Sequence, residues 1–113
     1  MILPFIDTNQ LDLREPREGW KGRFFHSRNM TFAYYTVQAG ASIHEHSHAN
    51  DEVWNVLEGQ LEITIAGETR IAGPGSAAVV PPDSLHSAKA LTDARVIVVD
   101  YPLRESIGGV DLR

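Results

Sequence analysis

The 113-residue chain contains no cysteine. Without cysteine neither a disulfide framework nor a thiolate metal site can form, so any bound metal must be held by nitrogen and oxygen atoms. The chain also has no apolar run that approaches the roughly 20 residues of a membrane span. Its first residues, Met1 to Asp7, lack the basic region and long apolar stretch of a secretory signal. We therefore expect a cytoplasmic protein with no membrane partner.

Positive charge is scarce as well. Lysine and arginine number 10 against 15 acidic residues, which gives a net charge of −5. A nucleic-acid surface needs clustered Lys and Arg, so this balance argues against a nucleic-acid partner and is compatible with a small-molecule site. Hydrophobic residues make up 42% of the chain and charged residues 22%, values typical of a globular domain. The length predicts one domain with one core.

No amphipathic helical pattern of ten or more residues is present. Short β-forming runs separated by glycine-rich turns are typical of an all-β sandwich or a closed barrel. Closure is favoured because it removes exposed sheet edges. The predicted strands cover residues 21–26, 31–39, 42–48, 52–57, 60–65, 69–72, 77–80, 87–90 and 95–101.

We divide this single domain into three segments. Residues 1–30 form an N-terminal arm with the first strands, residues 31–101 form the barrel core, and residues 102–113 form a tail that packs on a neighbour or frays. Between Thr8 and Trp20 the arm is polar, and we expect an irregular stretch with one helical turn or an edge strand.

The apolar start of the arm, Met1 to Ile6, precedes this polar stretch. Such a segment suits exchange between two copies of the chain, so we expect a homodimer. The alternative is a strand that covers its own barrel.

Histidines are unusually placed in this chain. His44, His46 and His48 alternate, and in a strand all three side chains would point to one face. Glu52 follows after a short turn, and His86 follows a second turn rich in glycine and proline. Neutral imidazole and carboxylate together suit divalent transition metals, so the pattern predicts a metal site without specifying a substrate.

Two stretches carry a family resemblance. The first resembles the first cupin motif at all of its fixed positions, Gly40, His46, His48, Glu52 and Gly59. The second resembles the second cupin motif at Gly75, Pro81 and His86, but has Asp83 and Ala90 where the family usually has glycine and asparagine. The resemblance covers residues 36–100, most of the chain.

This resemblance implies a conical double-stranded β-helix, the jelly-roll barrel of the cupins. It also implies a divalent metal held by His46, His48, Glu52 and His86, with open positions for water or substrate. Mn²⁺, Fe²⁺, Ni²⁺, Co²⁺, Cu²⁺ and Zn²⁺ all suit such ligands. A cupin that has lost its metal is the alternative, and the complete ligand set argues against it.

Among the small single-domain cupins, the chain resembles those of pectin degradation, which help to linearise unsaturated uronate sugars. Gly73-Pro74-Gly75, the two prolines before His86 and the closing Asp100–Glu105 segment carry this resemblance. In that subgroup an aspartate stands twelve residues after the last metal histidine and an arginine eighteen after it. Arg104 matches the arginine, whereas the aspartate position is the apolar Val98. Asp100 lies two residues further on with the same parity, so it can reach the same face.

Our catalytic candidates are Asp100, Tyr34 and Arg104. Asp100 and either Tyr34 or Tyr35 would move protons if they face the cavity. Tyr34, Tyr35 and Trp54 are the aromatic candidates for facing the ion.

We expect the remaining histidines and arginines to lie outside the set of metal ligands. We expect His44 to line the mouth of the site or to lie behind the ligands, and His26 to be a hydrogen-bonded residue outside it. Arg23, Arg95 and Arg104 are surface residues by default. An arginine that faces inward would indicate an anionic substrate.

Three functional hypotheses follow. The first is a metalloenzyme, of dioxygenase or isomerase type, that acts on a small oxygen-rich metabolite such as a sugar acid, diketone or phenolic. The second is a non-catalytic cupin module that binds a sugar or other small molecule. The third is a metal-free sugar-nucleotide isomerase, and the complete ligand set argues against it.

Overall fold

The structure is a computed structural model that describes residues 4–113. Its regular elements are strands, apart from one short 3₁₀ turn, η1 (Thr8–Gln10). The strands are β1 (Arg14–Arg17), β2 (Trp20–His26), β3 (Thr31–Val37), β4 (Ser42–His46), β5 (Asp51–Glu58), β6 (Leu61–Ile65), β7 (Glu68–Ala72), β8 (Ala77–Val80), β9 (His86–Ala90), β10 (Ala94–Tyr101), β11 (Ser106–Ile107) and β12 (Val110–Asp111). The predicted all-β class is confirmed, and every predicted strand has an observed counterpart.

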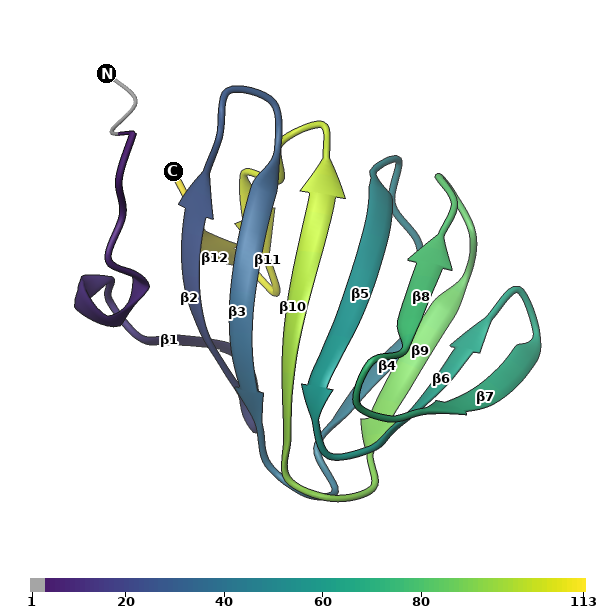
Figure 1. The fold of residues 1–113 in the computed structure, drawn as a ribbon. Helices are drawn as coiled ribbons and strands as arrows, with labels where there is room; N and C mark the ends of the chain where they lie inside the picture. The colour runs from purple at the N-terminus through teal and green to yellow at the C-terminus, as the bar shows by residue number, and fades with distance from the viewer. Residues whose placement is uncertain (1–3) are drawn as a thin grey trace.

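The strands form two antiparallel sheets and a small ribbon. The larger sheet has the order β1-β2-β3-β10-β5-β8, and the smaller sheet, whose strands are at the lower right in Figure 1, has the order β4-β9-β6-β7. Strands that are distant in sequence, such as β3 and β10 or β4 and β9, are hydrogen-bonded neighbours. This winding between two sheets is the jelly-roll barrel that was predicted.

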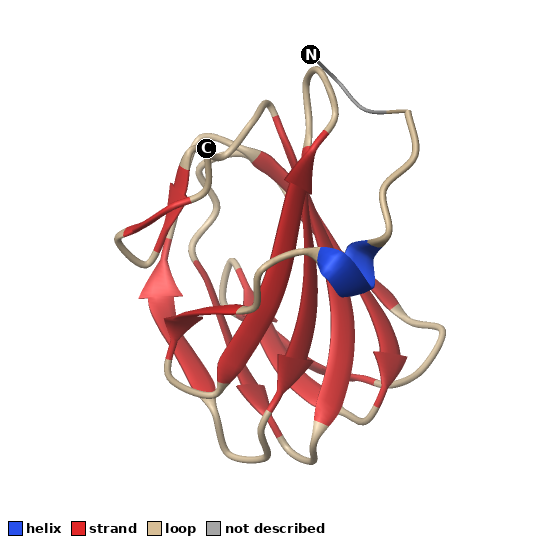
Figure 2. Ribbon diagram, turned by 90° about the vertical axis from the view of Figure 1, so that its left-hand side faces the viewer, coloured by secondary structure: helices blue, strands red, loops and turns tan. Residues whose placement is uncertain are grey.

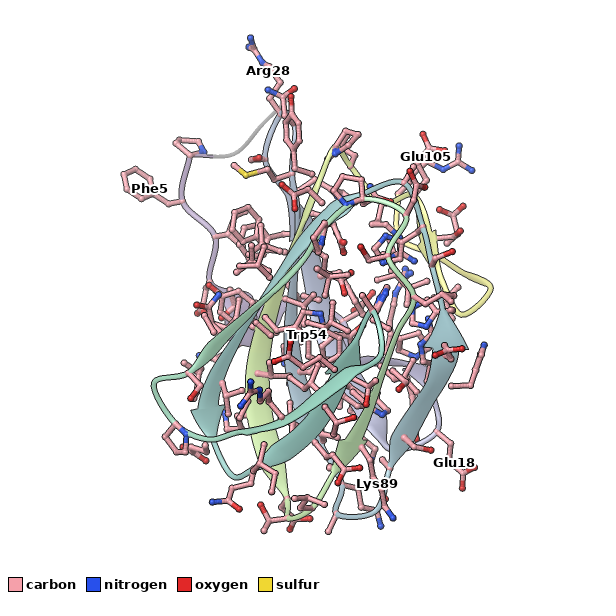
Figure 3. All side chains as sticks on the ribbon, turned by 90° about the vertical axis from the view of Figure 1, so that its right-hand side faces the viewer. Phe5, Glu18, Arg28, Trp54, Lys89 and Glu105 are labelled. Carbon is pink, nitrogen blue, oxygen red and sulfur yellow. The ribbon has the colours of Figure 1, made fainter. Side chains whose placement is uncertain are left out.

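Aromatic side chains fill one part of the space between the sheets. Trp20 is completely buried, and the rings of Tyr35 and Trp54 meet it edge to face at centroid distances of 5.5 and 5.7 Å. Trp54 lies in the interior of the barrel in Figure 3. Alternation along β10 turns four side chains inward, from Ala94 at its start to Asp100 near its end. Polar groups therefore collect where β10 ends and where β5 and β9 begin.

The predicted arm contains both of the elements offered as alternatives for it. Residues 8–10 make the helical turn η1, and residues 14–17 make the edge strand β1 of the larger sheet. Figure 2 shows η1 outside the barrel. Phe5 is 90% exposed and projects away from the strands (Figure 3). The predicted strand exchange also involves residues 1–3, which lie outside the described residues.

The tail packs on its own chain. Strands β11 and β12 pair as a hairpin, and its apolar side chains Ile107 and Leu112 are buried. The carbonyl of Leu112 bonds to Nε2 of His26 at 2.8 Å, and the carbonyl of Asp111 accepts a hydrogen bond from Arg14. The hairpin thus connects the end of the chain to β1 and β2.

None of the helical structure in residues 4–113 has the length and apolar character needed to cross a membrane.

Candidate metal centre

A β-bulge in β4 places His46. Ile43 pairs with Ala88 and His46 pairs with His86, so three steps along β4 match two steps along β9. The extra residue puts both Ile43 and His46 on the inner side of the sheet, while His44 is exposed. His44 therefore lies at the exposed edge of the histidine group, with its ring centroid 5.8 Å from that of His46.

His86 begins β9 after the turn at Pro81-Pro82-Asp83. Asp83 has a φ of +64°, in the left-handed region that glycine adopts without strain. The Asp83 amide donates to the carbonyl of His48 at 2.7 Å, so the two histidine-bearing segments are joined by the backbone. This conformation explains why the family motif usually has glycine at the position of Asp83.

The same hydrogen-bond arrangement orients two of the histidines. Nδ1 of His46 lies 2.8 Å from the carbonyl oxygen of His44, and Nδ1 of His86 lies 2.9 Å from that of Ser84. A carbonyl only accepts, so each Nδ1 carries the hydrogen. The Nε2 atoms of His46 and His86 are thereby left as free lone-pair donors, as metal ligation requires.

Glu52 joins the histidines from the start of β5. Its Oε2 lies 3.1 Å from Nε2 of His48, and its Oε1 lies 3.5 Å from Nε2 of His86. Trp54 donates its indole N–H to Oε1 at 2.5 Å. Glu52 and Trp54 are both buried because alternation along β5 turns them inward.

These residues fit a divalent transition metal. Single ligand atoms of His46, His48 and His86 lie within 4.8 Å of one another, and the same holds for His48, Glu52 and Asp100. Nε2 of His48 and Nε2 of His86 are buried, and the Glu52 carboxylate is the polar group beside them among the described residues. Buried imidazole nitrogens that converge beside one carboxylate form a donor set that a cation would satisfy. The four predicted ligands therefore form a group that could hold a metal ion.

A second carboxyl group, Asp100, lies beside this group with 1% of its surface exposed. Burial, together with the neighbouring Glu52 carboxylate, raises the pKa of Asp100. Burial also opposes ionisation of Glu52, but hydrogen bonds from His48, His86, Asp100 and Trp54 outweigh it and lower the pKa of Glu52. The two shifts have opposite directions, so Glu52 ionises more readily than Asp100.

Histidine charge follows from the same surroundings. Burial lowers the pKa of His46. For His86 burial acts in the same direction, but the Glu52 carboxylate and the Ser84 carbonyl outweigh it, and the pKa of His86 is raised. In the metal-free protein His86 is therefore the ligand that holds a proton more tightly than an ordinary histidine.

Arg104 faces inward, contrary to its expected surface position. Its side chain is 14% exposed, and Nη1 lies 3.5 Å from Oε2 of Glu52 and 3.8 Å from Oδ2 of Asp100. Thr31 holds the Arg104 backbone, because its Oγ1 accepts from the Arg104 amide at 2.8 Å and donates to the Arg104 carbonyl at 3.3 Å. The inward arginine is the feature that the sequence analysis linked to an anionic substrate.

A small cavity of about 20 Å³ opens between these groups, roughly the space of one or two water molecules. Tyr35, Trp54, Asp100 and Arg104 line it together with Arg17 of β1. Arg17 was missed by the sequence analysis, because the run Arg14–Arg17 has neither apolar alternation nor a motif. Only the pairing of β1 with β2 brings it to the site.

Three of the remaining candidates lie on the outer face of their strands. Tyr34 points to the outer side of β3 beside Arg23 and Arg95, so its predicted place at the metal is corrected in favour of Tyr35. Arg95 pairs with Glu58 on the outer surface, and Arg23 donates to the Leu11 carbonyl of the arm. These positions agree with their expected surface location.

Two other predicted residues lie as expected. Val98, at the subgroup's aspartate position, is buried and lines the cavity. Both ring nitrogens of His26 have partners, Thr31 Oγ1 and the Leu112 carbonyl, each at 2.8 Å. His26 is therefore the satisfied residue outside the site that was predicted.

Comparisons with known proteins agree with this geometry. The sequence model of the cupin domain family matches residues 33–101 of this chain. An uncharacterised protein of Streptomyces coelicolor is 34% identical over 90 residues, which cover 79% of this chain and 86% of that protein.

Two solved structures are similar over nearly the whole chain. KdgF from Halomonas sp. superposes with a TM-score of 0.85 at 27% identity, covering 92% of this chain and 97% of that one. An RmlC-like cupin from Shewanella frigidimarina superposes with a TM-score of 0.86 at 23% identity, covering 92% and 95%. With the two motifs, the barrel and the histidine cluster in place, the chain belongs to the cupin family.

Proposed function

We propose that this cupin is a metal-dependent enzyme that acts on a small sugar acid, with His46, His48, Glu52 and His86 as the metal ligands. The observation that carries this proposal is that the group of three histidines adjoins a cavity lined by His46, Glu52 and the inward Arg104. Imidazole and carboxylate ligands suit a divalent transition metal, and a guanidinium beside them suits a carboxylate of the substrate.

The metal, when bound, would supply a Lewis acid that polarises a substrate oxygen. The remaining steps belong to the protein. Asp100 is buried and its Oδ1 has no hydrogen-bond partner among the described residues, so this oxygen is free to hold or deliver a proton. Arg104 binds and orients an anionic group. Val98 and Trp54 keep water from the inner wall of the cavity.

Within the sugar acids, we propose linearisation of an unsaturated uronate as the reaction. The resemblance to the pectin-degradation cupins supports this choice, and Arg104 occupies the arginine position of that subgroup. The similarity to KdgF from Halomonas sp. over 92% of the chain is a second support. Opening the ring breaks the bond between the anomeric carbon and the ring oxygen, while the anomeric hydroxyl loses a proton and the ring oxygen gains one. The enol formed becomes a ketone when its hydroxyl loses a proton and the neighbouring carbon gains one, and these proton transfers are the work assigned to Asp100.

A non-catalytic sugar-acid binding module is the second candidate. Its specific support is the size of the cavity, since about 20 Å³ admits a carboxylate group more readily than a whole sugar ring. A binder would hold the carboxylate there and leave the ring at the mouth of the site.

Turnover of an unsaturated uronate separates these two candidates. We expect metal-loaded protein to consume the uronate, and Asp100→Asn to lower kcat by at least roughly 100-fold, as loss of a proton-transfer group does. Asp51→Asn, an exposed carboxylate at the start of the same strand as Glu52, is the matched control and should keep full activity. Binding of uronate without any turnover would replace the enzyme with the binding module.

We also propose that two copies of the chain associate through the outer face of the larger sheet. The exposed Val79, Leu57 and Tyr101 on that face, and the exposed Phe5 of the arm, support an apolar contact. Light scattering after size-exclusion chromatography should give twice the mass of one chain, and a single-chain mass would contradict the homodimer. The cytoplasmic location is likewise a proposal, which fractionation of the source cells would test.

A further inference from the structure

Arg17 is an arginine of the site whose charge is not balanced by any contact. Its side chain is half-buried and lines the cavity with His46, Glu52 and Arg104. Among residues 4–113, no hydrogen bond or ion pair reaches the Arg17 guanidinium. Other arginines donate to an oxygen of the protein: Arg14, Arg23, Arg70, Arg95, Arg104 and Arg113. A guanidinium has five N–H donors, and those of Arg17 bond to no group of the described protein, so they are available to a ligand in the cavity.

The surroundings of Arg17 favour an anion as the ligand. Burial lowers the pKa of Arg17, and the like charge of Arg104 acts in the same direction. Glu52 and Asp100 lie against Arg104, at 3.5 and 3.8 Å, and neither makes an ion pair with Arg17 among the described residues. A divalent metal on Glu52 would add further positive charge to this space. An anionic ligand would therefore gain from both arginines at once.

The backbone around Arg17 is held in place from two sides. Glu15 accepts a hydrogen bond from the amide of Gly19 at 2.9 Å, across the turn that follows β1. Gly108 of the tail hairpin lies against the Pro16 carbonyl so closely that a Cβ there would stand 2.3 Å from the oxygen. Arg17 is thus preorganised by the segments on either side of it, as a ligand-binding residue needs to be.

We propose that Arg17 is a substrate-binding residue that holds the carboxylate of a sugar acid, on the wall of the cavity shared with Arg104. This inference rests on the proposed function and specifies how its substrate is recognised. The planar fork of Arg17 presents two parallel donors to the two oxygens of one carboxylate. Specificity for the acid over the neutral sugar would then come from a residue of the edge strand β1, outside the two cupin motifs.

Calorimetry with two sugars tests this assignment. The probe is D-galacturonate, and D-galactose is its neutral counterpart, each titrated into Zn²⁺-loaded protein. Arg17→Met keeps the aliphatic stem and removes the charge, Arg17→Lys keeps the charge and removes the planar guanidinium, and Arg95→Met makes the same charge change on the outer surface.

We expect galacturonate to bind to the wild type and galactose not to bind. Arg17→Met should weaken galacturonate binding by roughly 10- to 100-fold, the range for a lost charge-assisted hydrogen bond. Arg17→Lys should be intermediate, and Arg95→Met should match the wild type.

Thermal unfolding without ligand distinguishes binding from a structural role. Arg17 makes no hydrogen bond or ion pair with the described protein, so Arg17→Met should unfold at the same or a higher temperature than the wild type. A purely structural arginine would lower the unfolding temperature when removed. Galacturonate should raise the unfolding temperature of the wild type, and the same concentration should raise that of Arg17→Met by less.

The outcomes separate this inference from the proposed function. If Zn²⁺ does not bind to the wild type, the metal-dependent function itself fails. If Zn²⁺ binds but galacturonate does not, or binds Arg17→Met as tightly as the wild type, the assignment of Arg17 is overturned and the metal site stands. If Arg17→Met does not fold, Arg17→Lys decides, and wild-type affinity in that variant would overturn the role of the guanidinium fork.

Discussion

Glu52 is the residue on which His48, His86, the Asp100 carboxyl group and Arg104 converge. Its oxygens lie 3.1 Å from His48, 3.5 Å from His86 and 3.5 Å from Arg104. A buried carboxylate with so many positively polarised neighbours remains ionised. Because Glu52 keeps the charge, Asp100 keeps the proton, and the two carboxyl groups acquire different chemical roles from their surroundings.

The charged groups around Glu52 predict how the stability of the metal-free protein depends on pH. In metal-free protein kept in chelator, the pKa values of His86 and Asp100 are raised. A group with a raised pKa contributes stability that is complete below its unfolded-state pKa and is lost as pH rises through the folded value. The lowered pKa of Glu52 affects stability only in acid. Urea unfolding should therefore show lower stability at pH 9 than at pH 6.

Metal should reverse this trend, because it competes with protons for the histidines and binds more tightly as pH rises. His86→Gln, measured without metal, should flatten part of the pH dependence. Equal stability of the wild-type metal-free protein at both pH values would contradict the assigned charge states.

Thr31 provides the second prediction. Its hydroxyl is bonded to both the amide and the carbonyl of Arg104 and lies 2.8 Å from Nδ1 of His26. Thr31→Val keeps the shape and leaves these groups without a partner, which should cost about 1–3 kcal/mol of unfolding free energy. Thr36→Val, on the exposed face of the same strand, should change it by no more than about 0.5 kcal/mol. Equal effects of the two variants in urea unfolding would show that the Thr31 contacts do not hold the tail.

Among the elements, β4 shows where sequence reasoning succeeds and where it fails. Motif spacing identified His46 and His48, but simple alternation placed His44 beside them. Ile43 is apolar and buried, so unbroken alternation would have turned His46 outward. One extra residue resolves the conflict. Residues three apart in a regular strand face opposite sides, so two inward residues at positions 43 and 46 indicate a bulge.

Strand β1 and the tail hairpin could not be placed from sequence. Arg14–Arg17 has no alternating pattern, and its position depends on pairing with β2 and on contact with Gly108. Arg104 follows β10 on a segment whose course depends on Thr31 and on the buried Ile107. These are contacts between distant parts of the chain, which periodicity does not report. Gly108-Gly109 did indicate a turn, but not where the turn packs.

The tail hairpin supplies the third prediction. Gly108 and Gly109 both have positive φ values, but only Gly108 is in contact with a neighbour, the Pro16 carbonyl. Gly109→Ala should cost about 1–2 kcal/mol for the left-handed backbone alone. Gly108→Ala should cost more and should also weaken galacturonate binding, because it displaces the strand that carries Arg17. Urea unfolding and calorimetry of the two variants measure these effects, and a smaller loss in Gly108→Ala than in Gly109→Ala would contradict the contact.

Across the whole molecule, the aromatic cluster and the candidate metal site meet at Trp54, which packs on Trp20 and donates its indole N–H to Glu52. Trp20 and its aromatic neighbours fill the barrel where β2 begins, and the histidines lie where β5 and β9 begin. The cupin fold and its four candidate ligands were predictable because the motifs encode turns and inward positions. Recognition of an anionic group was predictable in part: the family resemblance pointed to Arg104, whereas Arg17 reaches the cavity only through the pairing of β1 with β2.

The most direct test of this account is the metal content of untagged protein, measured by elemental analysis beside His46→Ala, His86→Ala and His44→Ala. We predict one divalent transition metal per chain in the wild type and in His44→Ala, because residue 44 supplies only its backbone carbonyl to the site. We predict loss of the metal in His46→Ala and His86→Ala. Equal loss in His44→Ala, or a wild type that holds no metal after reconstitution, would contradict the central claim that His46, His48, Glu52 and His86 form a metal centre.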